Sequence, residues 1–270
     1  MIKSCFSFLI ISIAAFLFAG CYNRETKVDK SHLLGYDYRL YQNSIAWELA
    51  KAVEDEDIKK IQIEVARDKS LLKFQEPRFG TTLLQMAVRT KKYRSAESLA
   101  QLGADPNLQN TYEGHSSLME AAAIGFGLLQ TGRDTRYLKL LLGHRGNPNT
   151  ESHGGTRAEG IKGDTPLSIA CLNGSLAYVK ILVEAGANVN HIRNNGYDAL
   201  CNAAIQKYPD IVLYLLNHGA IYKCPLSTDY DGTKEYIADL IRDWDFEKGS
   251  ERFKTQLKII AFLRKNGEKI

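Results

Sequence analysis

Histidine is the side chain that most readily binds metal ions or transfers protons near neutral pH, and this 270-residue chain holds six. They are His32, His115, His144, His153, His191 and His218. None has the H-x-x-x-H or H-E-x-x-H spacing that places two imidazoles on one side of a helix. We therefore predict solvated loop histidines and no metal site. The acidic run "EDED" at 54–57 is likewise expected to be a hydrated turn.

Two other motifs approach catalytic patterns without completing them. Gly155 and Gly160 have the glycine spacing of a phosphate-binding loop, but Ile161 stands where that loop needs lysine. In "GHSSL", from 114 to 118, Leu118 replaces the last glycine of a nucleophile elbow. Because no set of acid, base and nucleophile remains, we predict that the chain is not an enzyme and uses no cofactor.

The N-terminus holds one charge, Lys3, followed by an uncharged, mostly apolar run from 5 to 20. This run suits a secretory signal peptide and is short for a membrane span of about 20 residues. It ends in Phe18-Ala19-Gly20-Cys21, which resembles the lipobox of bacterial lipoproteins, with Phe18 in place of the usual Leu. The resemblance implies that residues 1–20 are removed and that the thiol of Cys21 receives a diacylglycerol.

A buried N-terminal helix and an uncleaved anchor are the alternatives to a lipoprotein signal. If Cys21 is lipidated, residues 21–40, which are polar and aperiodic, form a tether to the bilayer. The protein is then periplasmic and bound to a membrane through its lipid alone. Tyr22 is not the Asp that favours inner-membrane retention in enteric lipoproteins, so we predict the outer membrane.

Charge and cysteine content exclude further classes. The net charge of the chain is +4, with no concentrated basic patch, so nucleic acid is not an expected partner. Cys171, Cys201 and Cys224 are an odd set without C-x-x-C spacing, which argues against a zinc site or a disulfide framework. Cys171 and Cys201 are expected to be small buried hydrophobes. Oxidation of one pair in the periplasm stays open.

The second half of the chain repeats. "GDTPLSIACLNGSLAYVKILVEAGANVN" begins at Gly163, a second copy begins at Gly196, and earlier copies begin at Gly80 and Gly114. This period and the intact Thr165-Pro166-Leu167 resemble the ankyrin repeat, which recurs about every 33 residues, with Ser168 in place of the usual His. The turns Gly103-Ala104-Asp105, Gly186-Ala187-Asn188 and Gly219-Ala220 match the family as well.

Local patterns support the same fold. Leu167, Ala170 and Cys171 recur on one face of a short helix, and Thr165 is placed to cap it. We predict an all-α solenoid of helix pairs with β-hairpin-like fingers over 41–270. It holds about four clear repeats, with degenerate caps at 44–67 and 235–267. The basic stretch 254–269, with Leu257 on its apolar side, is expected to be a capping helix, and a membrane-binding helix is the alternative.

Glycine spacings locate two insertions. The first glycine and the turn glycine are equally spaced in the copies from Gly80, Gly163 and Gly196, but the copy from Gly114 holds nine more residues, near 125–136. The link from Gly146 to Gly163 exceeds the next link by seven, which lengthens the finger 150–164. Insertions of this kind lie in connections and often bind partners.

The ankyrin resemblance implies a concave binding surface made of finger tips and the edges of the first helices. Carried onto this chain, it comprises Arg89, Thr90, Tyr112, His115, His153, Arg157, Asp164, Leu172, Asn173, Arg193, Asn194, Tyr197 and Gln206. The expected partner is another protein. One hypothesis is an immunity protein that inhibits an antibacterial effector such as a secreted phospholipase, because ankyrin lipoproteins resemble immunity partners of type VI effectors. The other is a scaffold that docks a resident envelope enzyme.

Overall fold

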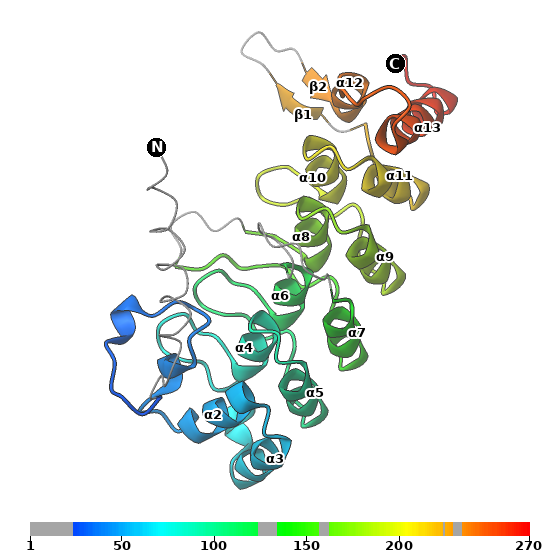
Figure 1. The fold of residues 1–270 in the computed structure, drawn as a ribbon. Coiled ribbons are helices and arrows are strands. Elements are labelled where there is room, and N and C mark those ends of the chain that lie inside the picture. Colours follow the sequence, from blue (N-terminus) through cyan, green and yellow to red (C-terminus); the bar gives the residue numbers. More distant parts are fainter. Residues whose placement is uncertain (1–23, 124–133, 157–161, 224, 229–233) are drawn as a thin grey trace, which may run out of the picture.

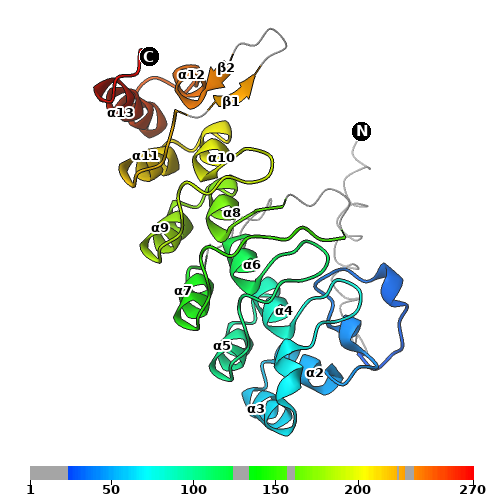
Figure 2. The same cartoon turned by 180° about the vertical axis from the view of Figure 1, so that it is seen from behind.

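The computed structural model describes residues 24–123, 134–156, 162–223, 225–228 and 234–270, which form a stack of helix pairs (Figure 1). Each pair has one helix on the inner side, next to the fingers, and one on the outer side. Turning the molecule by 180° shows the same two rows from behind (Figure 2). The predicted all-α solenoid is confirmed.

The inner row contacts itself from pair to pair, and so does the outer row. The inner helices are α2 (Trp47–Asp55), α4 (Leu83–Arg89), α6 (Ser117–Ala123), α8 (Pro166–Leu172), α10 (Ala199–Ile205) and α12 (Ile237–Arg242). The outer helices are α3 (Ile58–Arg67), α5 (Tyr93–Gln101), α7 (Arg136–Gly143), α9 (Leu176–Glu184), α11 (Pro209–Asn217) and α13 (Glu251–Lys265). Such nearest-neighbour stacking is how repeat proteins bury a face that one repeat leaves exposed.

Short elements complete the part of the chain that the structure describes. Three 3-10 helices are η1 (Lys30–His32), η2 (Tyr38–Tyr41) and η3 (Lys69–Lys73), and the strands β1 (Pro225–Thr228) and β2 (Lys234–Tyr236) pair in antiparallel fashion. The fingers between repeats bond laterally to one another, as where the Thr111 N–H donates to the Phe79 carbonyl at 3.0 Å. The Thr156 N–H donates to the Thr111 carbonyl at the same distance. The fingers therefore form a continuous edge beside the inner helices.

The inner helices begin where the sequence predicts. The Thr165 side chain accepts a hydrogen bond from the Ser168 N–H while Ser168 bonds back to the Thr165 N–H, and Pro166 occupies the first turn. Thr82 and Gln85 form the same reciprocal cap on α4. Each such cap satisfies N–H groups that the first turn of a helix leaves without partners.

The turn after the outer helix requires a left-handed residue, and the structure corrects one of our assignments. Gly103, Gly186 and Gly219 have φ values of 98°, 87° and 83°, but in the copy from Gly114 the left-handed residue is Arg145, with φ 69°. Gly146, which the sequence suggested, is one position too late. When Arg145 is taken as the turn residue, the insertion within the copy from Gly114 and the insertion in the link to Gly163 each hold eight residues. The prediction failed because glycine usually takes this conformation, and here arginine does.

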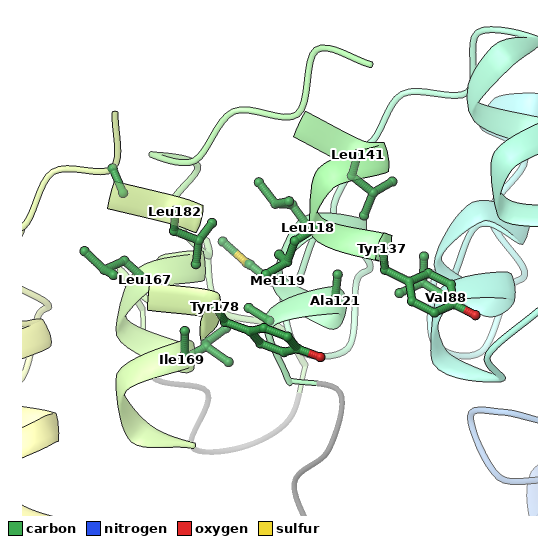
Figure 3. Close-up of a cluster of buried hydrophobic side chains, with 14 of the residues drawn as sticks. Val88, Leu118, Met119, Ala121, Tyr137, Leu141, Leu167, Ile169, Tyr178 and Leu182 are labelled. Atoms are coloured by element: carbon green, nitrogen blue, oxygen red, sulfur yellow. The ribbon is translucent and has the colours of Figure 1, made fainter. Parts of the chain in front are cut away.

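The core runs between the two rows of helices. Leu118 and Met119 of α6 and Leu141 of α7 are fully buried (Figure 3). Tyr137, from α7, points toward Val88 of the preceding repeat, and its ring also meets Tyr93 edge-on with centroids 5.3 Å apart. Burying side chains of this size stabilises a fold by roughly 1.5 to 3 kcal/mol each.

Asparagine side chains join successive turns at the far end of each repeat. In each case the Nδ2 atom donates to a carbonyl of the next turn and the Oδ1 atom accepts from an N–H slightly further along that turn. The donations run from Asn107 to Arg145 at 2.9 Å, from Asn149 to Gly186 at 3.0 Å and from Asn190 to Gly219 at 3.1 Å. The accepted bonds come from Asn147, Asn188 and Ile221. These bridges set the spacing between repeats.

Replacing Asn149 with alanine is therefore expected to lower the free energy of unfolding by about 1 kcal/mol, because both inter-repeat hydrogen bonds are lost at a solvated site. Urea denaturation followed by circular dichroism measures the change. Gln101→Ala is the matched control, since this exposed amide ends an outer helix. Equal midpoints for the two variants would show that the bridge contributes nothing.

The segment expected to be a tether is folded from residue 24 onward. Leu40 is fully buried, and Tyr38 and Leu33 are nearly so. Arg24 pairs with Asp55 at 2.8 Å, and the Tyr41 hydroxyl donates to the Thr81 carbonyl at 2.7 Å. The polar composition concealed this packing because the apolar residues follow no helical or strand period. The expected signal peptide and Cys21 lie outside the described residues.

The C-terminal helix α13 packs on α11 and α12, as expected of a cap. Its buried side is Gln256, Ile259 and Leu263, whereas Leu257, which we placed on the apolar side, is 48% exposed. Cys171 and Cys201 are buried, as predicted, and no disulfide joins them; burial raises the pKa of the Cys171 thiol far above its ordinary value. Cys224 lies outside the described residues, and no described helix has the length and apolarity to cross a bilayer.

Candidate functional site

The last residues of the inner helices form a row that faces the fingers. In α4, α6, α8 and α10 this position is held by Arg89, Ala123, Leu172 and Ile205. Leu172 and Ile205 are 40% and 43% exposed, which is unusual for aliphatic side chains on helices that are otherwise mostly buried. Ala123 is partly exposed between Arg89 and Leu172. The row is therefore apolar from α6 to α10 and charged at α4.

The N-terminal segment covers the start of this row. Arg24 contacts the end of α2, and the Tyr38 hydroxyl bonds to the Thr90 hydroxyl at 2.9 Å. The Gly35 carbonyl accepts from Arg89 at 2.9 Å. In Figures 1 and 2 this segment, in blue, lies beside α2 and the first fingers. The N-terminal segment therefore contacts the α4 end of the row.

A cavity of about 330 Å³ lies where the N-terminal segment, the fingers and the inner helices meet. Three of the predicted residues, Arg89, Tyr112 and His115, line it together. The remaining lining is Gly35, Tyr36, Phe79, Glu113, Glu120 and Ala123. Phe79 and Tyr112 come from neighbouring fingers, and their rings pack edge to face with centroids 5.1 Å apart. The cavity thus has aromatic walls and a charged floor.

Arg89 and Glu120 form the floor as a largely buried ion pair. The Arg89 Nε atom donates to Glu120 Oε2 at 3.2 Å, and its Nη2 atom donates to Glu120 Oε1. Burial by itself lowers the pKa of Arg89, but the charge and hydrogen bonds of Glu120 outweigh it, so the pKa stays above its ordinary value. The guanidinium is therefore held as a fixed charge.

Glu113, His115 and Glu120 bring three potential ligand atoms within 4.8 Å of one another, and this spacing could suit a cation such as zinc. However, both oxygens of Glu120 already accept from Arg89. Arg89 also lies 3.6 Å from Glu113. Arg89 thus already occupies Glu120 and offsets one of the two carboxylate charges, and we assign no metal to the cluster.

The other predicted contact residues divide into structural and exposed ones. Arg193 is 5% exposed and donates to Asp164 at 2.9 Å and to Asn202 at 2.5 Å, so it locks one finger to α10 and offers little surface. His153, Asn194 and Gln206 are exposed, Tyr197 and Asn173 are half-buried, and Arg157 lies outside the described residues. The exposed members follow the fingers and the helix ends.

Sequence reasoning missed seven residues of this surface: Gly35, Tyr36, Phe79, Glu113, Glu120, Ala123 and Ile205. Ile205 had a usable signal, because it stands one repeat period after Leu172, in the equivalent position of the next copy. Tyr36 had none, since its position depends on how an aperiodic segment folds back.

A larger hollow of about 430 Å³ lies between the ends of α5 and α7, away from the fingers. Its lining includes Asn107, His144 and Arg145. Asn107 and the Arg145 carbonyl are already joined by the inter-repeat bridge. The hollow is therefore a product of the turns, and the surface near the fingers remains the candidate site.

Comparison with known proteins identifies the repeat. The family model described as ankyrin repeats, in three copies, matches residues 118–224. The chain is 33% identical over 140 residues to NF-kappa-B inhibitor alpha of Sus scrofa, and the match covers 49% of this chain and 40% of that protein. It is 30% identical over 159 residues to Protein PhlB of Serratia liquefaciens, covering 59% and 62% of the two chains.

A shorter match, 40% identical over 57 residues, joins the chain to the human Notch-regulated ankyrin repeat-containing protein and covers 21% and 50% of the two. The chain thus spans less than two thirds of each of these relatives. Ankyrin repeats are protein-interaction modules, and their family match coincides with helix pairs α6–α7, α8–α9 and α10–α11. Residues 118–224 are therefore ankyrin repeats, at the centre of an all-α ankyrin-repeat solenoid.

Proposed function

We propose that this protein is lipid-anchored in the periplasm and binds another protein with the surface between its fingers and inner helices. The observation that carries the binding proposal is the open row Ala123, Leu172 and Ile205 beside the charged cavity at Arg89. Apolar residues that remain exposed next to fixed polar groups are typical of interface cores and their rims.

The sharper proposal is that binding inhibits the partner. A rigid solenoid can cover the mouth of an active site, and one relative of this chain carries the word inhibitor in its name. The partner class that we propose is an antibacterial effector that acts in the periplasm, such as a phospholipase delivered by type VI secretion. The protein would then be an immunity protein, and its anchor would hold it beside the bilayer that such a lipase attacks.

Inhibition is tested with the partner captured from the source strain. Titrating the protein into the purified partner should abolish its lipase activity at a 1:1 molar ratio. A stoichiometric complex in which the partner keeps full activity would contradict the immunity role and favour an envelope scaffold.

The proposed lipid anchor at Cys21 can be tested separately. Cys21→Ser should move the protein from the detergent phase to the aqueous phase in a Triton X-114 partition, because stable anchoring needs two or more acyl chains on the cysteine. Mass spectrometry of the wild-type N-terminal peptide should find diacylglycerol on Cys21. Cys5→Ser is the matched control and should leave both results unchanged. Detection of an uncleaved, unmodified N-terminus in the wild type would contradict the lipoprotein assignment.

A further inference from the structure

The cavity beside Arg89 combines aromatic walls with an excess of negative charge. Tyr36 stands at its edge with 58% of its surface exposed, and Tyr112 is half-buried beside Phe79. The charged groups of the lining are one guanidinium and two carboxylates, those of Glu113 and Glu120, and His115 Nδ1 lies 3.7 Å from a Glu113 oxygen. Carboxylates outnumber the guanidinium, so the lining favours a cationic guest over an anion or a neutral group.

The size of the cavity fits one long side chain. Small-molecule sites usually measure about 300 to 1,000 Å³, and this cavity of about 330 Å³ lies at the lower limit of that range. Its lining includes Ala123, so a guest in the cavity would lie next to the first member of the row Ala123, Leu172 and Ile205. A side chain projecting from a protein partner could therefore enter while its backbone lies over the apolar row.

We infer that this cavity takes a basic side chain, arginine or lysine, of the protein partner proposed above. The aliphatic stem would contact the tyrosine rings, and the charged head would meet the carboxylates. A cation over an aromatic face gains roughly 0.5 to 2 kcal/mol, more where water is excluded. The inference rests on the proposed binding function and adds the chemistry of one contact.

Two rings of this fold already accept cations: Phe79, which lines the cavity, and Tyr93, which belongs to the outer helix α5. The guanidinium of Arg78 lies 4.7 Å from the centroid of Phe79, and that of Arg136 lies 4.5 Å from the centroid of Tyr93. These contacts show that arginine on an aromatic ring is compatible with the local packing. Tyr36 and Tyr112 are the cavity walls that would provide the same contact to a guest.

A metal ion explains the lining less well. To bind Glu120, a divalent cation would have to displace Arg89 from two hydrogen bonds in a largely buried site. Removing one partner of a buried ion pair is strongly unfavourable. A basic side chain requires no such displacement, because it joins the existing charges at the open side of the cavity.

Nuclear magnetic resonance on the full, detergent-solubilised chain tests the inference without knowledge of the partner. The probes are the N-acetyl methylamides of arginine, lysine and norleucine, the last being a neutral chain of similar length. The arginine and lysine probes should shift the backbone amide signals of residues 112–120, with dissociation constants about tenfold below that of norleucine.

Two variants locate the effect. Glu113→Gln should remove most of the preference for the cationic probes, and Tyr36→Leu should weaken them about threefold through the loss of one ring. Glu151→Gln is the matched control, because this carboxylate lies on the next finger with 56% of its side chain exposed. It should leave every dissociation constant unchanged. Retained amide spectra show that each variant is folded.

Equal affinity for norleucine and the cationic probes would overturn the inference. So would shifts that lie outside the cavity, or saturable binding of Zn²⁺ that Glu113→Gln abolishes while the cationic probes do not bind. Failure of this inference and failure of the proposed function give different results. Probes that bind as expected to a chain that captures no partner would leave the cavity assignment standing and remove the function.

Discussion

Replacing Arg89 with methionine is expected to lower the free energy of unfolding by about 3 kcal/mol. The substitution leaves the carboxylate of Glu120, which is 8% exposed, without its counter-charge, and it removes the donor to the Gly35 carbonyl. Loss of one member of a buried pair costs roughly 3 to 5 kcal/mol because the other charge stays desolvated. We choose the lower limit because Arg89 is still 22% exposed in its side chain.

A double-mutant cycle separates this cause from lost packing. Arg89→Met combined with Glu120→Met should recover about 2 kcal/mol of the loss, since an apolar pair of similar size replaces the ionic one. Urea denaturation gives each free energy. Arg67→Met, at a pair whose arginine is 71% exposed, is the control and should change little. If the double variant were as unstable as the single one, the pair would not be the source of the effect.

The second large effect concerns binding. The double variant Leu172→Glu/Ile205→Glu is expected to raise the dissociation constant for the captured partner at least about 100-fold, which corresponds to roughly 2.7 kcal/mol. Both side chains are more than one third exposed, so the fold tolerates the charges, whereas an apolar interface would have to bury them without partners. Surface plasmon resonance measures the change.

The control for this variant is Ile63→Glu. Ile63 belongs to the outer helix α3 and is 57% exposed, so its substitution introduces a similar charge on the opposite row. It should leave the dissociation constant unchanged. If Ile63→Glu weakened binding as much as the double variant, the partner would bind the outer row or respond to net charge alone.

The fold was predictable because each repeat contains residues that are typical of the start and the end of its helices. Thr165 and Pro166 mark a helix start, Gly186 marks its partner's end, and the regular period repeats both marks along the chain. Where arginine replaces the usual turn glycine, at Arg145, the predicted turn residue was wrong by one position. The physical reason is that the turn needs a left-handed backbone, for which glycine is the common solution and arginine a rarer one.

The site was only partly predictable because it combines residues of the regular repeats with residues of the aperiodic N-terminal segment. Arg89, Leu172 and Gln206 follow from the repeat, since they end or follow equivalent inner helices. Arg193 was assigned to the surface by the same rule but is buried, because Asp164 and Asn202 draw its guanidinium inward. Pairwise contacts of this kind depend on rotamers and distances that a sequence pattern does not encode.

The position of Tyr36 shows most clearly what the sequence pattern could not predict. It reaches the cavity only because the segment 24–41 folds back over the inner helices, anchored by Arg24, Tyr38 and Leu40. These residues have no shared period, so composition indicated a tether. The segment instead narrows the concave surface to the part between α6 and α10 and supplies one wall of the cavity.

Capture of the partner under matched conditions tests the central claim most directly. The tagged protein and its Leu172→Glu/Ile205→Glu variant would be used as paired baits in lysate of the source strain, grown with its secretion systems active. We predict one stoichiometric protein that the wild type retains, that the variant loses, and whose lipase activity falls on binding. A protein retained equally by both baits, or no protein specific to the wild type, would contradict binding through the row between the fingers and the inner helices.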